Sequence, residues 1–284
     1  ALESGYSPST LILDAPFVID QGQGLPKWRP ANYTKKFYGP STMRLGIEKS
    51  RNLMTVRLAQ TIGMDKISEY ASRFGVVSNM PQQLAMSLGA GETTLLNLTA
   101  GYGMLVNGGK KITPTLIDRI QNRHGENVFT HDSRACDQCK ASFWTSQSVP
   151  VLDDIRDQLS NPASAYQIVS MLKGVVDRGT GRSIRSLGKP LGGKTGTTNK
   201  SVDAWFVGFS ADLVVGVFAG FDKPKSLGKM EQGASVAAPI FKAFMKEVLA
   251  DSSATPFRIP PGIRLVRVNA ITGRPAKSED KKII

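Results

Sequence analysis

The fold is decided by the stretch Asp203-Ala204-Trp205-Phe206-Val207-Gly208-Phe209, which is followed after Ser210-Ala211-Asp212 by a second apolar run, Leu213 to Phe221. Both runs are rich in Val and Phe, and the three residues between them can form a tight turn. We therefore predict an antiparallel β-hairpin. A glycine-rich run, Gly192 to Thr198, comes just before it. We expect Lys194 to Thr197 to pair beside the first strand of the hairpin.

Much of the rest of the chain carries helical periodicity. Apolar residues recur on one face over 53–62 and 67–74, and a glycine is placed to end each helix. Asn161-Pro162 supplies a cap followed by proline at the first helical position. Further helices are expected over 94–106 (a buried one), 162–179 and 234–249. Helices, then strands, then a helix indicate an α+β fold in which helices cover an antiparallel sheet.

Two segments do not fit this pattern. Residues 1–40 are rich in Gly and Pro and predict extended segments and loops, and residues 119–150 predict an irregular, exposed excursion. The excursion holds the only two cysteines, Cys136 and Cys139, and the only two histidines, His124 and His131. Their spacing matches no common zinc site, so we predict no metal here. A short disulfide is favoured in an oxidising compartment, and a redox Cys-x-x-Cys is the weakest alternative.

Composition limits the classes of function. The chain has 284 residues and a net charge of +13, which suits one large domain or two small ones. A basic balance could attract nucleic acid, but no basic run with interleaved aromatics supports that interpretation. A solvated basic surface or attraction to an anionic envelope is favoured instead. No stretch approaches the ~20 apolar residues of a membrane span, and residues 1–20 do not have the pattern of a signal peptide.

Two short motifs carry the chemistry. The run Gly192 to Thr198 is not typical of a phosphate loop, because it lacks the earlier glycine and leads towards a strand rather than a helix. Ser50-Arg51-Asn52 is uninformative alone, as is Lys194-Thr195-Gly196. Their order gives them weight, because Ser-x-Asn comes first and Lys-Thr-Gly follows just before a hairpin, as in penicillin-recognising serine acyl-transferases.

The chain resembles the transpeptidase domain of class A penicillin-binding proteins of the 1A type. The match is carried by several stretches along nearly the whole chain: Trp28 to Tyr33, Phe37 to Arg44, Ser50 to Asn52, Ser87 to Gly89, Asn107 to Gly109, Arg178 to Gly181, Gly193 to Thr198, Asp203 to Phe209 and Ala237 to Phe241. The resemblance implies a penicillin-binding protein/β-lactamase-like fold, a five-stranded antiparallel sheet with helices on both faces. It implies acyl transfer from a peptide ending in D-Ala-D-Ala, through a serine ester, with no cofactor.

The resemblance also implies roles for individual residues. Ser50 would pass a proton between the reacting serine and the leaving amine, and Lys194 beside it would favour the deprotonated partners. Asn52 would hold the amide of the donor peptide. The hydroxyls of Thr195 and Thr197 would bind the terminal carboxylate.

Two further roles concern the strand that carries Lys-Thr-Gly. The backbone N–H of Thr197 would supply half of an oxyanion hole. Gly196 would leave room for substrate along the strand edge.

One part of the family pattern is missing. In the family the nucleophile belongs to a Ser-x-x-Lys tetrad upstream of Ser-x-Asn, and residues 1–49 contain none. The tetrads Ser186 to Lys189 and Ser226 to Lys229 are expected to be chance matches, because each contains a glycine that opposes a helix. We therefore expect an incomplete fold with three of the five strands, inactive alone.

The function predicted from the sequence is peptidoglycan D,D-transpeptidation by one domain of a bifunctional cell-wall synthase. Residues 1–250 form that domain, and residues 251–284 a C-terminal extension. Its partners would be stem peptides, β-lactams and, through a parent anchor, the periplasmic face of the bacterial inner membrane. The alternatives are a D,D-carboxypeptidase or β-lactamase-like hydrolase, and a non-catalytic peptidoglycan-binding scaffold.

Overall fold

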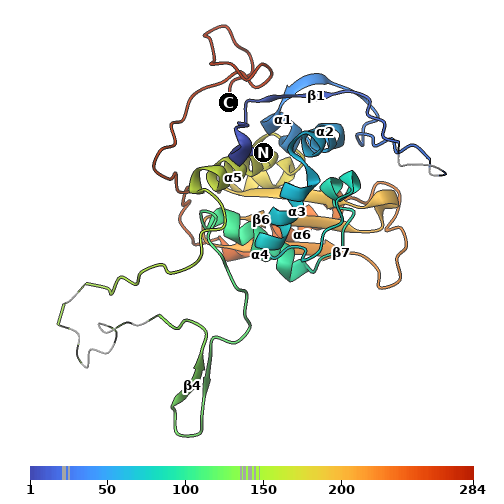
Figure 1. The fold of residues 1–284 in the computed structure, drawn as a ribbon. Helices are drawn as coiled ribbons and strands as arrows, with labels where there is room; N and C mark the ends of the chain where they lie inside the picture. The colour runs from blue at the N-terminus through green and yellow to red at the C-terminus, as the bar shows by residue number, and fades with distance from the viewer. Residues whose placement is uncertain are drawn as a thin grey trace.

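The computed structural model describes residues 1–20, 24, 26–134, 136, 139, 143, 145, 146 and 148–284. At its centre is a three-stranded antiparallel sheet in the order β5-β6-β7 (Figure 1). The strands are β5 (Gly192–Thr197), β6 (Ala204–Phe209) and β7 (Val214–Ala219). Thr195 pairs with Phe206, and Phe206 with Val217. The predicted hairpin and the predicted pairing of β5 beside its first strand are confirmed.

Helices pack on both faces of this sheet, because neighbouring residues of β6 point to opposite sides. Phe206 is fully buried, and its ring centroid lies 4.9 Å from that of Phe241 of α6 (Ala238–Val248), with the two rings tilted by 55°. Phe209 faces the other way, towards Tyr102 of α4 (Leu95–Val106) and the apolar side of α5 (Pro162–Asp177). The predicted α+β class, with helices covering an antiparallel sheet, is confirmed.

A second group of elements precedes the sheet in the chain. A short antiparallel pair, β1 (Leu11–Asp14) and β2 (Gly39–Thr42), leads into α1 (Met43–Glu48), α2 (Asn52–Ile62) and α3 (Met64–Arg73). Gly63 ends α2 with a φ of 91°, which a glycine adopts readily. Short turns complete the order: η1 (Leu2–Ser4), η2 (Leu84–Leu88), η4 (Arg182–Leu187), η5 (Asn199–Ser201) and the π-turn η6 (Gly233–Ala237). None of the helices in the described ranges is long and apolar enough to cross a bilayer.

The expectation that residues 94–106 form a buried helix is wrong in one respect. The helix α4 exists, but only Gly101, Gly103 and Met104 are buried, and Leu96 is 54% exposed. One side of α4 packs on β7. Leu98, Gly101, Tyr102 and Leu105 of α4 also line an open cavity, so the described residues cover that side of the helix only in part.

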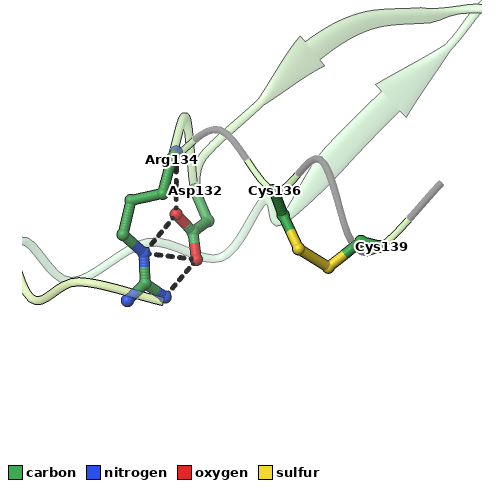
Figure 2. The surroundings of a disulfide bond; sticks show 4 residues. All are labelled: Asp132, Arg134, Cys136 and Cys139. Atoms are coloured by element: carbon green, nitrogen blue, oxygen red, sulfur yellow. Dashed lines mark hydrogen bonds and ion pairs between the residues drawn. A yellow bond between two sulfur atoms is a disulfide. The ribbon is translucent and has the colours of Figure 1, made fainter. Parts of the chain in front are cut away.

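The excursion over 119–150 is more ordered than expected. It contains a hairpin of β3 (Arg119–Gln121) and β4 (Asn127–Thr130), and it extends away from the body of the molecule (Figure 1). Cys136 and Cys139 form a disulfide, beside an ion pair of Asp132 and Arg134 (Figure 2). Both sulfurs are therefore engaged, and the described residues hold no cluster of three metal-ligating side chains.

Three apolar surfaces lie uncovered among the described residues. A cavity of about 810 Å³ lies between α1, α2, α3, α4 and α5. The strand β7 pairs with β6 alone, so its other edge has no partner within the described sheet. Ile240, Phe244 and Val248 form an exposed stripe along α6, spaced one turn apart.

Candidate active site

The candidate site is built around the turn between α1 and α2. The helix α1 ends at Glu48, Lys49 caps it, and α2 begins at Asn52, so Ser50 lies in a break between two helices. Ser50 has a φ of 52°, a left-handed conformation that is uncommon for residues other than glycine. A backbone held in such a conformation is often found at functional sites, where the surrounding contacts maintain it.

Lys194 of β5 reaches this turn from the sheet. Its Nζ donates to Ser50 Oγ at 2.7 Å and to the carbonyl oxygen of Thr195 at 2.9 Å. Burial lowers the pKa of the Lys194 ammonium to about 8, because a low-dielectric environment disfavours the charged form. The structure thus brings the two sequence motifs into direct contact, with a lysine that can lose its proton near neutral pH.

The two threonines of β5 are held by different partners. The Oγ1 atoms of Thr195 and Thr180 lie 2.9 Å apart and share a hydrogen bond. Thr197 Oγ1 accepts a hydrogen bond from the backbone N–H of Gly233 at 3.0 Å, which leaves its own O–H free to donate. Gly233 packs directly on the strand, since a Cβ there would lie 2.5 Å from the carbonyl oxygen of Gly196.

Asn52 lies at the start of α2, two residues from Ser50, and its amide group is directed to a different partner from Lys194. Its Nδ2 donates to the carbonyl oxygen of Ala31 at 2.9 Å. Next to it, buried Asn32 accepts from the backbone N–H of Leu53 at 3.3 Å and donates to Asp14 at 2.8 Å. These contacts fix the segment around residue 31 to the start of α2. The sequence analysis assigned no site role to Asn32 or Asp14.

A buried ion pair supports the turn from behind. Glu48 accepts from Arg178 Nη2 at 2.6 Å and Nε at 3.2 Å, and its carbonyl oxygen accepts from Thr180 N at 3.1 Å. Gly179 makes room for this approach, because a Cβ there would collide with the backbone of Glu48. The contact links the Ser50 turn to Thr180 and so to β5. Sequence reasoning missed this pair, because a Glu and an Arg separated by 130 residues give no local signal.

The two tetrads dismissed as chance matches lie outside this site. Ser186 belongs to η4 and donates to the carbonyl oxygen of Ser183, while Lys189 donates to that of Ser252 at 2.6 Å. Ser226 lies in an exposed loop, where Gly228 N donates to its Oγ at 3.2 Å. Neither serine has a lysine beside its hydroxyl.

The sequence holds two more Ser-x-x-Lys tetrads besides these, Ser170 to Lys173 and Ser278 to Lys281, and neither was among the predicted chance matches. The first is helical, on α5, and has the right local geometry. Its hydroxyl, however, accepts from Arg44 Nη2 at 3.1 Å, and Lys173 pairs with Asp177 at 2.6 Å. The second lies in the extension, outside any helix. Neither supplies a serine next to Lys194.

The arrangement can recognise a carboxylate and move protons. The ammonium of Lys194 and the hydroxyls of Thr195 and Thr197 project from a strand that has only one neighbour in the described sheet. An extended peptide could add to such a free edge through main-chain hydrogen bonds. Ser50, in contact with Lys194, is placed to exchange a proton with a bound group. The residues named from the sequence lie on the two sides of one site, and their roles remain predictions.

The chain is similar to proteins of one known family. Residues 1–246 match the family described as penicillin binding protein transpeptidase domain. The chain is 44% identical over 277 residues to penicillin-binding protein 1A of Rickettsia bellii, covering 96% of this chain and 35% of that protein. It is 31% identical to penicillin-binding protein 1A of Pseudomonas aeruginosa, covering 97% of this chain and 37% of that one. The chain therefore spans about a third of the length of these curated relatives.

Solved structures are similar as well. The crystal structure of penicillin-binding protein 1A from Haemophilus influenzae aligns with a TM-score of 0.84 at 30% identity, covering 99% of this chain and 45% of that one. The penicillin-binding protein PonA1 from Mycobacterium tuberculosis aligns with a TM-score of 0.76 at 19% identity, covering 100% and 72%, and shows the fold alone. Because the family match covers the sheet, the Ser50 turn and β5, this chain belongs to the penicillin-binding protein transpeptidase domain family.

Proposed function

We propose that this chain cross-links peptidoglycan as the D,D-transpeptidase part of a bifunctional synthase that faces the periplasm from the inner membrane. The observation that carries the proposal is the 2.7 Å contact between Lys194 Nζ and Ser50 Oγ, which joins the two motifs into one site. The substrates are stem peptides that end in D-Ala-D-Ala, and β-lactams are the competing ligands. Family membership supports the reaction class, and the relatives named penicillin-binding protein 1A support the kind of parent protein.

The residues of this chain divide the work as follows. The hydroxyls of Thr195 and Thr197 donate to the terminal carboxylate of the donor peptide, and Lys194 attracts it. Asn52 orients the donor amide. During acylation a serine hydroxyl loses its proton as it attacks the carbonyl carbon, and Ser50 relays a proton to the departing D-alanine amine.

We propose further that the nucleophilic serine arrives on a segment outside residues 1–284 that fills the cavity. An engineered protein cavity of about 150 Å³ can stay empty, whereas this one is about 810 Å³ and mainly apolar. Its lining includes Gly46, Ile47 and Met54, which flank the Ser50 turn. A helix seated there would present its side chains beside Ser50. The region that carries this segment would also cover the free edge of β7 and the exposed stripe on α6.

Fluorescent penicillin tests this proposal. The chain is expressed alone and together with the region that precedes it in the gene, and each product is labelled and mapped by mass spectrometry. We expect a covalent adduct only in the longer protein, on a serine upstream of residue 1. Ser50→Ala and Lys194→Met in the longer protein should slow labelling strongly, because each removes one partner of the central contact.

Other labelling sites would contradict parts of the proposal. An adduct on Ser50 would make Ser50 the nucleophile, activated by Lys194 as a serine–lysine pair. An adduct on Ser170, Ser186 or Ser226 would place the reaction outside this site. A longer protein that stays unlabelled while it binds stem peptides would support the scaffold alternative.

A further inference from the structure

Two segments lie directly beside the residues proposed to hold the reacting end of a peptide. One is Ala31–Lys36 and the other is the start of η6, and we call them the walls of the site. Asn52 donates to Ala31, and Thr197 accepts from Gly233, so both walls are attached directly to the predicted substrate-binding residues. A peptide bound by Asn52 and Thr197 as proposed would extend past these walls.

The two walls meet through a single exposed contact. Gln232 Nε2 donates to the hydroxyl of Tyr33 at 2.5 Å, although the residues are 199 positions apart. Tyr33 is 70% exposed, so its ring is not part of the core. The loop beneath it is well fixed, because Asn32 is buried and donates to the carbonyl oxygen of Lys36 at 2.9 Å. The structure thus presents Tyr33 and its neighbours outward from a rigid base.

The charge on this wall has one sign. Residues 21–47 contain five cationic side chains, namely Lys27, Arg29, Lys35, Lys36 and Arg44, and no Asp or Glu. Arg44 is engaged by Ser170 and Glu48. Lys35 and Lys36 are exposed and form no ion pair with any residue in the described ranges. The Asp14 carboxylate nearby is already paired with Arg51 at 3.1 Å. Ammonium groups without an ionic partner attract ligands that carry carboxylates.

We propose that Tyr33, Lys35, Lys36 and Gln232 form a subsite for the carboxylate-bearing part of an acidic stem peptide, upstream of its reacting end. The inference rests on the proposed function for the direction in which the peptide lies. The lysines would pair with the carboxylates of the peptide, and the Tyr33 ring would pack on its aliphatic parts. Gln232 would exchange its bond with Tyr33 for one to the peptide backbone. The ligand class follows from the charges of Lys35 and Lys36 and from the edge of β5, which has no strand partner in the described sheet.

The test measures binding of a synthetic acidic stem pentapeptide to the complete synthase by isothermal titration calorimetry. A second peptide is identical except that its carboxylates upstream of D-Ala-D-Ala are amidated. The variant Lys35→Ala/Lys36→Ala is compared with Lys281→Ala/Lys282→Ala, a pair of adjacent exposed lysines in the C-terminal extension that removes the same charge. Unchanged melting temperatures would establish that all variants are folded.

We expect the Lys35/Lys36 variant to bind the acidic peptide about three- to tenfold more weakly, the range for one or two exposed charge pairs. It should bind the amidated peptide as the wild type does, and the Lys281/Lys282 variant should bind both as the wild type does. Added salt should reduce the preference of the wild type for the acidic peptide. Charge reversal, Lys35→Glu/Lys36→Glu, should weaken binding of the acidic peptide further.

Three results would overturn the subsite: equal affinity of the wild type for both peptides, equal loss for both peptides in the Lys35/Lys36 variant, or the same loss in the control variant. Fluorescent penicillin labelling of the wild type reports separately on the proposed function. Labelling without discrimination between the peptides would refute the subsite alone. If the wild type prefers the acidic peptide but is not labelled by fluorescent penicillin, the subsite is supported and the proposed catalytic function is not.

Discussion

The ion pair of Glu48 and Arg178 allows a quantitative prediction. The side chain of Glu48 is only 3% exposed, and its carboxylate forms ion pairs with both Arg178 and Arg44. Replacing it with alanine removes the carboxylate that both guanidinium groups share. Arg44 then retains its hydrogen bonds to Ser170, and Arg178 retains a 3.9 Å contact with Asp177. Removing one partner of a buried pair typically costs about 3–5 kcal/mol. Arg178 is 41% exposed, so water can compensate part of the loss. We therefore expect Glu48→Ala to lower the free energy of unfolding by about 2–4 kcal/mol.

The assay is thermal and denaturant unfolding of the complete domain. At about 2–4 °C per kcal/mol for a domain of this size, the melting temperature should fall by roughly 5–12 °C. A double-mutant cycle with Arg178→Ala should give a coupling energy of about 1–3 kcal/mol. The matched control is Glu69 and Arg73, an exposed ion pair on α3 with side chains 58% and 36% exposed. Glu69→Ala should change stability by less than about 0.5 kcal/mol.

The reasoning would be refuted if Glu48→Ala were as mild as Glu69→Ala. That outcome would mean that the ion pair of Glu48 and Arg178 contributes no more to the free energy of unfolding than the exposed pair of Glu69 and Arg73. A coupling energy near zero with two large single effects would also refute it, because the losses would then come from packing around each residue rather than from the pair.

Three further predictions concern the sheet. In the folded protein the pKa of Lys194 is about 8, below its ordinary value of 10.5, so the unfolded chain binds more protons between these pH values. The free energy of unfolding should therefore rise with pH across this window more steeply in the wild type than in Lys194→Met. An equal slope in the two proteins would contradict the lowered pKa. Gly233→Ala should lower stability by about 1–3 kcal/mol, because its Cβ would press on the backbone of Gly196; an unchanged denaturation midpoint would show that the two backbones can separate freely. Phe206→Ala should cost about 3–5 kcal/mol, since the ring is fully buried against Phe241; a loss under about 1 kcal/mol in urea unfolding would mean that the core collapses into the space.

The local elements could be predicted from the sequence because their signals are short. The period-2 run over Trp205, Val207 and Phe209 and the turn after it are a hairpin signal at any position in a chain. Asn161-Pro162 began a helix as predicted, with Asn161 Oδ1 accepting from Ala163 N at 2.8 Å. Gly63 ended another. Both causes are local: the Asn161 side chain accepts from nearby backbone, and Gly63 adopts a φ of 91° that glycine favours, so a short pattern is enough to predict each helix end.

The sequence was less informative about burial. Residues 94–106 were expected to be buried because they are apolar nearly throughout, yet one side of α4 faces the cavity. An apolar helix shows only that something should cover it. Whether a partner is present depends on the rest of the fold. The excursion gave the opposite error, since a short hairpin with every residue exposed has no apolar alternation to reveal it.

For the site, the sequence determined which residues could act, and the tertiary structure decided which of them meet. Ser50, Asn52 and Lys194 were found because they belong to short motifs in a particular order. The contacts that hold them do not belong to motifs: Glu48 with Arg178, Thr180 with Thr195, and Tyr33 with Gln232. Two of these pairs join residues more than 100 positions apart, and even Thr180 and Thr195 lie on different elements. Such contacts depend on how helices and strands pack, which local periodicity does not encode. The lowered pKa of Lys194 is likewise a result of tertiary packing, because it comes from burial of the ammonium where β5 meets the α1–α2 turn. The left-handed conformation of Ser50 lies in that same turn.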